Sequence, residues 1–327
     1  MYQTMLLPEA AIGHILRHNI ADASGRKALH KGRCLTTEDA AHLRQLGIEA
    51  VPVAIFEAGD IHEDEAARRV AAAVSGADVY ATTPAASRVN LLARCDGIVT
   101  VDVAGLLQIN AVEGVTVATR PTHSLVRARQ RIATIKIIPF AIPESALAEV
   151  VTIEHKHGPL VEVRPLQPHR VAVILVGSAT ARERLAQGVY PAIEARVIAL
   201  GSQVQSAYYV AVAEEAVVAG IAAALETGAE LIIIAGETSI MDRDDVTPRA
   251  IRLAGGRVEH YGAPVEPGNL LLMAYIDHTA SVVPILGAPG CVRSRDTNIV
   301  DLLLPRLLSG EHITRDAIIA LGHGGLL

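Results

Sequence analysis

The stretch that decides the fold is His169-Arg170-Val171-Ala172-Val173-Ile174-Leu175-Val176-Gly177-Ser178. An unbroken apolar run that ends at a glycine turn is typical of a parallel strand buried on both faces of a sheet. The same pattern returns at residues 230–235 before Gly236, and again at residues 281–286 before Gly287. An Ala-rich segment at residues 211–227 predicts a helix between the first two runs, and residues 194–200 predict another short strand. Strands that alternate with helices predict crossover units and a mostly parallel sheet.

The prolines just before this stretch indicate where the domain begins. Pro165-Leu166-Gln167-Pro168 breaks local structure and suits a linker. We therefore expect an α/β fold in which residues 169–327 form a C-terminal three-layer α/β/α domain with a mostly parallel sheet. Residues 1–168 predict a separate N-terminal mixed α+β domain. Its expected elements are a helix that begins at Thr36-Thr37-Glu38-Asp39, a second helix at residues 60–74, and short strands at residues 97–101, 114–118 and 132–138.

Composition agrees with a large apolar core and excludes some functions. The chain has 327 residues, enough for two domains, and 50% of them are hydrophobic while only 3% are aromatic. Scarce aromatic side chains disfavour binding of single-stranded nucleic acid, which depends on base stacking. A formal net charge of −6 gives no basic footprint for nucleic acid in general. We therefore expect no nucleic-acid partner.

The N-terminal and cysteine patterns bear on location. Residues 1–9 carry no basic region before their short apolar run, unlike a signal peptide. The most apolar stretch, residues 210–225, contains two glutamates and predicts a buried helix, because a membrane span tolerates few charges. Cys34, Cys95 and Cys291 form no CxxC pair, so reduced thiols are the simplest interpretation. We expect a cytoplasmic protein without membrane contact.

The most polar loop after a predicted strand is Gly236-Glu237-Thr238-Ser239-Ile240-Met241-Asp242-Arg243-Asp244-Asp245. A glycine lets the backbone turn closely around a ligand, and the Thr238 and Ser239 hydroxyls suit an anion. Asp242 and Asp244 are candidate ligands of a divalent metal such as Mg²⁺, which prefers carboxylate oxygens. The alternative interpretation is structural, because acidic residues before Val246-Thr247-Pro248 stabilise the start of a helix.

Two further loops follow predicted strands. Gly287-Ala288-Pro289-Gly290-Cys291-Val292-Arg293-Ser294 forms a stiff turn whose amides, with Arg293 and Ser294, suit a phosphate. Gly177-Ser178-Ala179-Thr180 offers small hydroxyl residues at a strand end. Taken alone, each loop is more simply explained as an ordinary turn. Arg293 could lower the pKa of Cys291, although a small buried turn residue is the simpler explanation. Ligands on such sheets bind beyond the carboxyl ends of the strands, so we expect the three loops to meet in one site.

In this order, the loops resemble the molybdopterin-binding domain shared by molybdopterin adenylyltransferases and molybdopterin molybdotransferases, the MogA and MoeA type that is fused in gephyrin. The resemblance covers residues 169–327. The loop that begins at Gly236 is similar to the family's glycine- and serine-bearing loop, and Val265-Glu266-Pro267-Gly268-Asn269 looks like its Pro-Gly turn. Gly287-Ala288-Pro289-Gly290 looks like its Gly-Leu-Pro-Gly turn. In the N-terminal half, Lys31-Gly32-Arg33-Cys34-Leu35 is similar to a stretch of the molybdotransferase type.

The chain also departs from the family pattern. Glu237 replaces the second glycine of a Gly-Gly pair, and a carboxylate there would repel phosphate unless a metal lay between them. The segment Val176-Gly177-Ser178-Ala179 lacks the adjacent acid of the family's first loop, and Cys291-Val292 replaces Asn-Pro. These changes indicate a divergent, molybdotransferase-like member.

The resemblance implies that molybdopterin or completed molybdenum cofactor binds at the strand ends. The implied ligand-binding residues are Gly177, Ser178, Gly236, Glu237, Thr238, Ser239, Gly287, Pro289, Gly290, Arg293 and Ser294. Asp242 and Asp244 are the implied catalytic residues and Mg²⁺ ligands. The implied function is molybdenum cofactor biosynthesis or delivery, with a Mg²⁺-dependent molybdotransferase-like activity left open. The resemblance also implies a homo-oligomer and a molybdenum enzyme as partner.

Two alternatives stay open. A non-catalytic carrier or scaffold would bind the cofactor without turnover and hand it to a molybdenum hydroxylase. An unrelated α/β enzyme would act on another phosphorylated metabolite. Because the chain lacks Gly-x-Gly-x-x-Gly and Gly-x-x-x-x-Gly-Lys-Ser/Thr loops, a dinucleotide enzyme or a P-loop NTPase is disfavoured.

Overall fold

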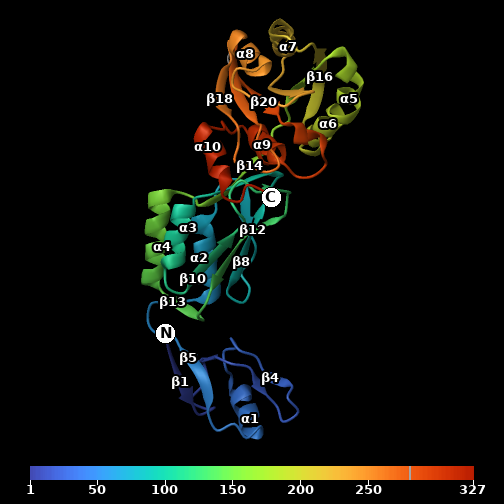
Figure 1. The fold of residues 1–327 in the computed structure, drawn as a ribbon. Helices are drawn as coiled ribbons and strands as arrows, with labels where there is room; N and C mark the ends of the chain where they lie inside the picture. The colour runs from blue at the N-terminus through green and yellow to red at the C-terminus, as the bar shows by residue number, and fades with distance from the viewer. Residues whose placement is uncertain (280) are drawn as a thin grey trace. The chain divides into compact units, whose positions relative to one another are not determined.

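The chain divides at the proline-bearing stretch that the sequence singles out. The computed structural model describes residues 1–279 and 281–327, and separates the units Met1–Arg164 and Pro165–Leu327 (Figure 1). The division lies four residues before the expected boundary at residues 168 and 169. Among the described residues, no helix has both the length and the apolar character that crossing a membrane requires.

In the C-terminal unit, strands and helices alternate as the apolar runs predict, which confirms the α/β class. The sheet has the strand order β16-β15-β17-β20-β19-β18. Its strands are β15 (Arg170–Val176), β16 (Gln203–Val210), β17 (Leu231–Gly236), β18 (Arg257–Tyr261), β19 (Leu272–His278) and β20 (Ser281–Ala288). The helices are η1 (Ala179–Ala181), α5 (Arg182–Gly188), α6 (Tyr190–Ala199), α7 (Glu214–Glu226), α8 (Val246–Leu253), η2 (Gly290–Arg293), α9 (Ile299–Leu308), α10 (Arg315–Ile319) and η3 (Ala320–Gly322).

Helices cover both faces of this sheet. Alternate residues of β15 point to opposite faces. Val171 and Val173 belong to a core cluster with apolar residues of α5, α6 and α9, whereas Ala172 and Ile174 belong to a second cluster with residues of α7 and α8. The C-terminal unit is therefore built of three layers, α/β/α.

The sheet is mixed. β15 pairs in parallel with β16 and β17, and β17 pairs in parallel with β20. β19 pairs antiparallel with both β20 and β18. The four parallel strands lie together in the strand order, so their carboxyl ends share one edge of the sheet. The three glycine-bearing loops follow β15, β17 and β20 at that edge.

The strand expected at residues 194–200 is wrong, because these residues belong to α6 and a loop. Ile193 and Val197 are buried four residues apart, which places them on one face of a helix, and Pro191 stands in its first turn. The strand in this part of the chain is β16, which follows α6. Exposed and half-buried residues alternate along it, as is typical of a strand with one face toward solvent.

The N-terminal unit is mixed α and β with antiparallel sheets. Strand β5 pairs antiparallel with both β1 and β2. In the β10-β12-β8-β7 sheet every pair of neighbouring strands is antiparallel. The expected helix at residues 60–74 begins only at Glu63, because residues 60–62 pair with β13 as β6. The elements are β1 (Tyr2–Leu6), β2 (Ile15–Leu16), β3 (Ile20–Ala21), β4 (Lys27–Leu29), α1 (Thr37–Gln45), β5 (Val51–Ile55), β6 (Asp60–His62), α2 (Glu63–Val74), β7 (Val79–Ala81), β8 (Arg88–Ala93), β9 (Gly97–Val101), α3 (Val103–Ala111), β10 (Val115–Thr119), β11 (Leu125–Val126), β12 (Arg131–Ile137), β13 (Ala141–Pro143), α4 (Glu144–His157) and β14 (Val161–Pro165).

Candidate functional site

The strand register brings the three predicted loops side by side. Val176 of β15 lies opposite Gly236 of β17, and Ala235 of β17 lies opposite Ala288 of β20. The three strands end at Val176, Gly236 and Ala288, and the loops continue from these strand ends. Because all three strands are parallel, their loops leave the sheet at the same edge, as expected for a ligand site of an α/β sheet.

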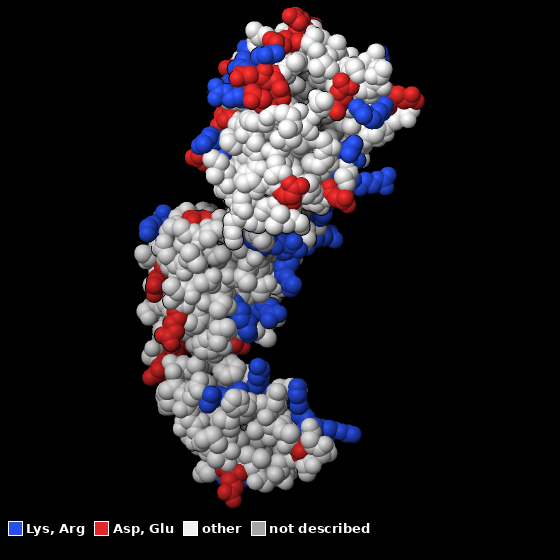
Figure 2. Space-filling view, in the orientation of Figure 1, with Lys and Arg blue, Asp and Glu red and all other residues white. Residues whose placement is uncertain are grey.

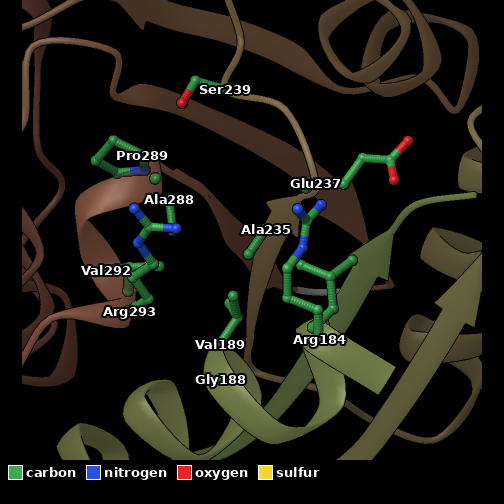
Figure 3. A pocket seen from close by; sticks show the side chains of 13 residues that line it. Arg184, Gly188, Val189, Ala235, Glu237, Ser239, Ala288, Pro289, Val292 and Arg293 are labelled. Carbon is green, nitrogen blue, oxygen red and sulfur yellow. The ribbon is translucent and has the colours of Figure 1, made fainter. Parts of the chain in front are cut away.

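A cavity of about 260 Å³ opens at this edge. Its lining comes from α5, from the end of β17 and its loop, and from the end of β20 with η2 (Figure 3). The lining residues are Arg184, Leu185, Gly188, Val189, Ala235, Gly236, Glu237, Ser239, Ala288, Pro289, Gly290, Val292 and Arg293. The cavity therefore joins two of the loops that the sequence predicts to meet.

Two arginines give this cavity a positive character. Arg184 extends from α5 and Arg293 from η2, and Figure 3 shows their guanidinium groups on different sides of the cavity. Neither forms an ion pair or a side-chain hydrogen bond with any described residue. Both side chains are exposed and free to bind an anion. Sequence analysis missed Arg184, because nothing in a short helical segment marks one arginine as facing a loop two strands away.

A second cavity, of about 230 Å³, lies against the other side of the β17 loop and shares Gly236, Ser239 and Ala288 with the first. Thr238, Met241, Asp245 and Thr247 contribute to its lining. The carboxylate of Asp245 accepts hydrogen bonds from the backbone amides of Met241 at 2.6 Å and Asp242 at 3.0 Å. These bonds fix the loop and hold a carboxylate at the second cavity.

Glu237 and Ser178 tie two of the loops together. The Ser178 hydroxyl donates a hydrogen bond of 2.7 Å to the Glu237 carboxylate, which links the end of β15 with the end of β17. The Tyr209 hydroxyl donates to the Ser178 carbonyl at 2.5 Å. Glu237 lines the first cavity, so its carboxylate lies beside a site that also holds two arginines. That site favours a ligand with both an anionic group and hydrogen-bond donors.

Arg196 of α6 holds the loop that carries Arg293. Its guanidinium donates to the Val292 carbonyl at 2.9 Å and to the Ser294 carbonyl at 2.8 Å, and it pairs with Asp301 at 2.9 Å. The Ser294 hydroxyl donates to Asp296 at 2.8 Å, and Ser294 lines neither cavity. The structure therefore places Ser294 in the support of the loop, whereas the sequence predicted it to bind the ligand.

Asp242 and Asp244 also lie outside both cavities. The Asp242 carboxylate accepts from the Asp244 amide at 2.7 Å, and the Asp244 carboxylate pairs with Arg252 at 3.0 Å. Within the described ranges, no group of three or more His, Cys, Asp or Glu side chains could hold a metal ion. These two residues do not fit a Mg²⁺ site at either cavity, and their geometry agrees with the alternative interpretation of an acidic segment before α8.

Two of the predicted glycines shape the site without lining it. A Cβ on Gly177 would lie 2.7 Å from the Tyr209 hydroxyl, and a Cβ on Gly287 would lie 2.9 Å from the Leu272 Cβ. Gly290 does line the cavity, and a Cβ there would meet only the Ser239 hydroxyl, at 3.1 Å. Close packing at Gly177 and Gly287 keeps the strand ends together, while Gly290 leaves room in the cavity itself.

The cysteine of the third loop is not activated. Burial raises the pKa of the Cys291 thiol, and Arg196 opposes that effect only weakly. Arg293 therefore does not lower this pKa, and the simpler explanation from the sequence, a small buried turn residue, agrees with the structure. Cys291 is a partly buried turn residue.

A protein-family model matches only a short part of the chain. A family described as a domain of unknown function (DUF8806) matches residues 8–55, in the N-terminal unit. No curated protein matches the chain in sequence.

Several solved structures are similar to parts of this one. The tungsten cofactor synthesizing protein MoaB from Pyrococcus furiosus is 16% identical, covers 43% of this chain and 91% of its own, and gives a TM-score of 0.32. The molybdopterin biosynthesis enzyme MoaB from Thermus thermophilus is 17% identical, with 44% and 98% covered and a TM-score of 0.32. A molybdenum cofactor biosynthesis protein from Pyrococcus furiosus is 11% identical, with 98% and 65% covered and a TM-score of 0.25. What this chain binds has to be inferred from the residues that line its own cavities.

Proposed function

We propose that the C-terminal unit binds molybdopterin or completed molybdenum cofactor, and that the protein serves the synthesis or delivery of that cofactor. The observation that carries the proposal is the pair of unpartnered arginines, Arg184 and Arg293, beside the glycine-bearing loops of β17 and β20. Guanidinium groups suit a phosphate through paired, charge-assisted hydrogen bonds. The phosphate of the pterin would bind between these two side chains.

The two cavities suit the two ends of such a ligand. Each is smaller than a typical small-molecule site of about 300–1,000 Å³, but they share the residues Gly236, Ser239 and Ala288. A pterin ring carries amino and ring N–H donors, and the Asp245 carboxylate and the Thr238 hydroxyl at the second cavity can accept from such groups. Glu237 would accept a further donor at the first cavity. The chain's own residues thus supply binding and orientation.

A non-catalytic carrier is the second candidate, and a specific observation favours it. The two aspartates expected to hold Mg²⁺ lie outside the cavities, and Asp244 is already paired with Arg252. A site without an evident metal ligand set suits binding and transfer better than adenylyl or molybdate chemistry. The recipient would then be a molybdenum enzyme such as a hydroxylase.

Mass spectrometry of small molecules released from the native protein tests the binding proposal. We expect a pterin phosphate, with or without molybdenum, in stoichiometric amount from the wild type. The variant R184Q/R293Q should release little of it, whereas R182Q/R295Q removes two nearby arginines that do not line the cavity and should retain it. A different phosphorylated metabolite in the wild type would replace the proposal with the third alternative. Incubation with molybdopterin, ATP, Mg²⁺ and molybdate then separates an enzyme from a carrier by whether nucleotide is consumed.

A further inference from the structure

One face of a sheet in the N-terminal unit is open and lacks acidic residues. Helix α2 packs against the other face of the β10-β12-β8-β7 sheet at β8 and β12, and α3 packs against β10, so the buried side chains of this face belong to the core cluster of the unit. Along β8 the burial alternates, with Arg88 and Asn90 outside the core. None of the four strands, all within the described residues, contains Asp or Glu. The four strands themselves therefore bring no negative charge to the open face.

Four exposed arginines lie on or at the end of these strands. Arg88 pairs in register with Lys136, and Arg131 pairs with Leu92. Arg120 follows β10 directly, and its Nε donates to the Arg131 carbonyl at 3.0 Å. Arg94 follows β8, and its guanidinium lies 5.4 Å from the centre of the Tyr80 ring. We call Arg88, Arg94, Arg120 and Arg131 the arginine face.

The charge of the arginine face is not compensated within the unit. No carboxylate of the described chain forms an ion pair with any of its four members. Neighbouring charges are already engaged: Arg127 pairs with Asp96 at 2.8 Å, and the Lys136 ammonium bonds the Ala86 carbonyl at 3.0 Å. In Figure 2, blue side chains gather over the region that Figure 1 labels β8 and β12. A local positive face on a chain of net charge −6 attracts anionic partners.

We propose that the arginine face docks an acidic segment of a partner protein. Guanidinium groups match carboxylates in geometry, and arginine is enriched at protein interfaces while lysine is depleted. Leu92 and Tyr80 lie in the same cross-strand row as Arg131 and add apolar contact area. Tyr80 is the only aromatic residue in the four strands, so a base-stacking platform for single-stranded nucleic acid is missing. This inference goes beyond the proposed cofactor site and does not depend on it.

Binding of a fluorescent poly-glutamate peptide to the full-length protein tests the proposal. Anisotropy is measured in about 50 to 300 mM NaCl, because contacts between exposed charges weaken as salt screens them. The test variant is R88E/R131E, since neither side chain forms a hydrogen bond that the fold needs. The matched control is R26E/K27E, which makes the same change in charge at two exposed residues of the β3–β4 hairpin.

The result expected is salt-dependent binding to the wild type and the control, with affinity reduced at least about tenfold in R88E/R131E. R88Q/R131Q, which adds no negative charge, should give a smaller loss in the same direction. Equal affinity for wild type and R88E/R131E would overturn the proposal. Tighter binding of single-stranded or duplex oligonucleotides of equal charge than of the peptide, lost in the same variant, would also overturn it in favour of nucleic acid. Circular dichroism melts of each variant show that the compared proteins are folded.

Discussion

Replacing Gly287 by alanine tests the packing at the edge of the sheet where we propose that the ligand binds. Gly287 lies in β20 opposite Leu272 of β19, and both residues are buried. A Cβ at this position would lie 2.9 Å from the Leu272 Cβ and 3.0 Å from the Ile240 Cδ1. The Leu272 Cβ is attached directly to the backbone and cannot rotate away, so a strand has to move. Overpacking of this kind costs about 1–3 kcal/mol, and we expect the upper half of that range.

Two glycines that line the first cavity, Gly188 and Gly290, serve as controls for Gly287→Ala. Gly188 closes α5 and lines the cavity, yet no atom lies within 4 Å of the position that an alanine Cβ would take there. Gly188→Ala should therefore leave the free energy of unfolding unchanged or raise it by up to about 1 kcal/mol, since alanine loses less backbone entropy. Gly290→Ala meets only a hydroxyl that can rotate, Ser239 Oγ at 3.1 Å, and should keep its stability while weakening ligand binding.

Urea unfolding followed by far-ultraviolet circular dichroism measures all three variants, because the chain has no Trp to report by fluorescence. The order of stability we expect is Gly188→Ala at or above wild type, Gly290→Ala near wild type, and Gly287→Ala lowest. Gly287→Ala with the same unfolding midpoint as wild type would show that the strand end is looser than the structure indicates. If Gly188→Ala lost as much unfolding free energy as Gly287→Ala, the reasoning from contact distances would be refuted.

Three further predictions concern other parts of the protein. Glu311→Gln should cost about 3–5 kcal/mol of unfolding free energy, measured in urea, because it leaves the Arg306 guanidinium, 1% exposed, without its carboxylate partner; an unchanged midpoint would contradict this. Burial raises the pKa of Tyr275 to about 12 in the folded protein. The protonated Tyr275 side chain therefore contributes its full share to the free energy of unfolding below about pH 10, the usual tyrosine pKa. This contribution is lost as the pH rises from about 10 to about 12. Urea midpoints at several pH values should show this loss in the wild type and less of it in Tyr275→Phe. Iodoacetamide should label Cys34, which is exposed, faster than Cys291, whose pKa is raised by burial; peptide mass spectrometry that found the reverse order would contradict the placement of the third loop.

The buried strands could be predicted from the sequence because their signal is local. Residues 171–176 and 231–235 are apolar without interruption, and each run ends at a glycine, so the strand and the turn are both visible in one short window. The antiparallel pairing of β18 and β19 was not predicted. Their pairing joins residues 257–261 with residues 272–275, and the loop between them contains the Pro267-Gly268 turn but is longer than a hairpin loop of about 2–5 residues.

The candidate site could be predicted only in part. Gly236, Glu237, Ser239, Pro289 and Gly290 lie at or just after strand ends, and they line one cavity at the carboxyl edge, where the rule for α/β sheets predicts a ligand site. Which acid of the β17 loop faces a cavity depends on how the loop turns into α8. The backbone amides of Met241 and Asp242 donate to Asp245 and hold its carboxylate at the second cavity, whereas Asp242 and Asp244 line neither cavity.

The roles of Arg184 and Arg196 could not be predicted from the sequence. Arg196 lies on α6 and reaches carbonyls about a hundred residues later in the chain, at Val292 and Ser294. Arg184 lies in the first turn of α5. Long-range contacts of this kind are set by how helices pack on the sheet, and their side chains look like ordinary solvated surface in the sequence.

The most direct test of the central claim is the affinity for molybdopterin, measured by calorimetric titration of the ligand-free protein. If Arg184 and Arg293 bind the pterin phosphate, R184Q/R293Q loses two charge-assisted contacts of about 1.5 kcal/mol each, which raises Kd about 100-fold. R182Q/R295Q should bind as the wild type does. Equal affinity in all three proteins would contradict the assignment of the ligand to this cavity.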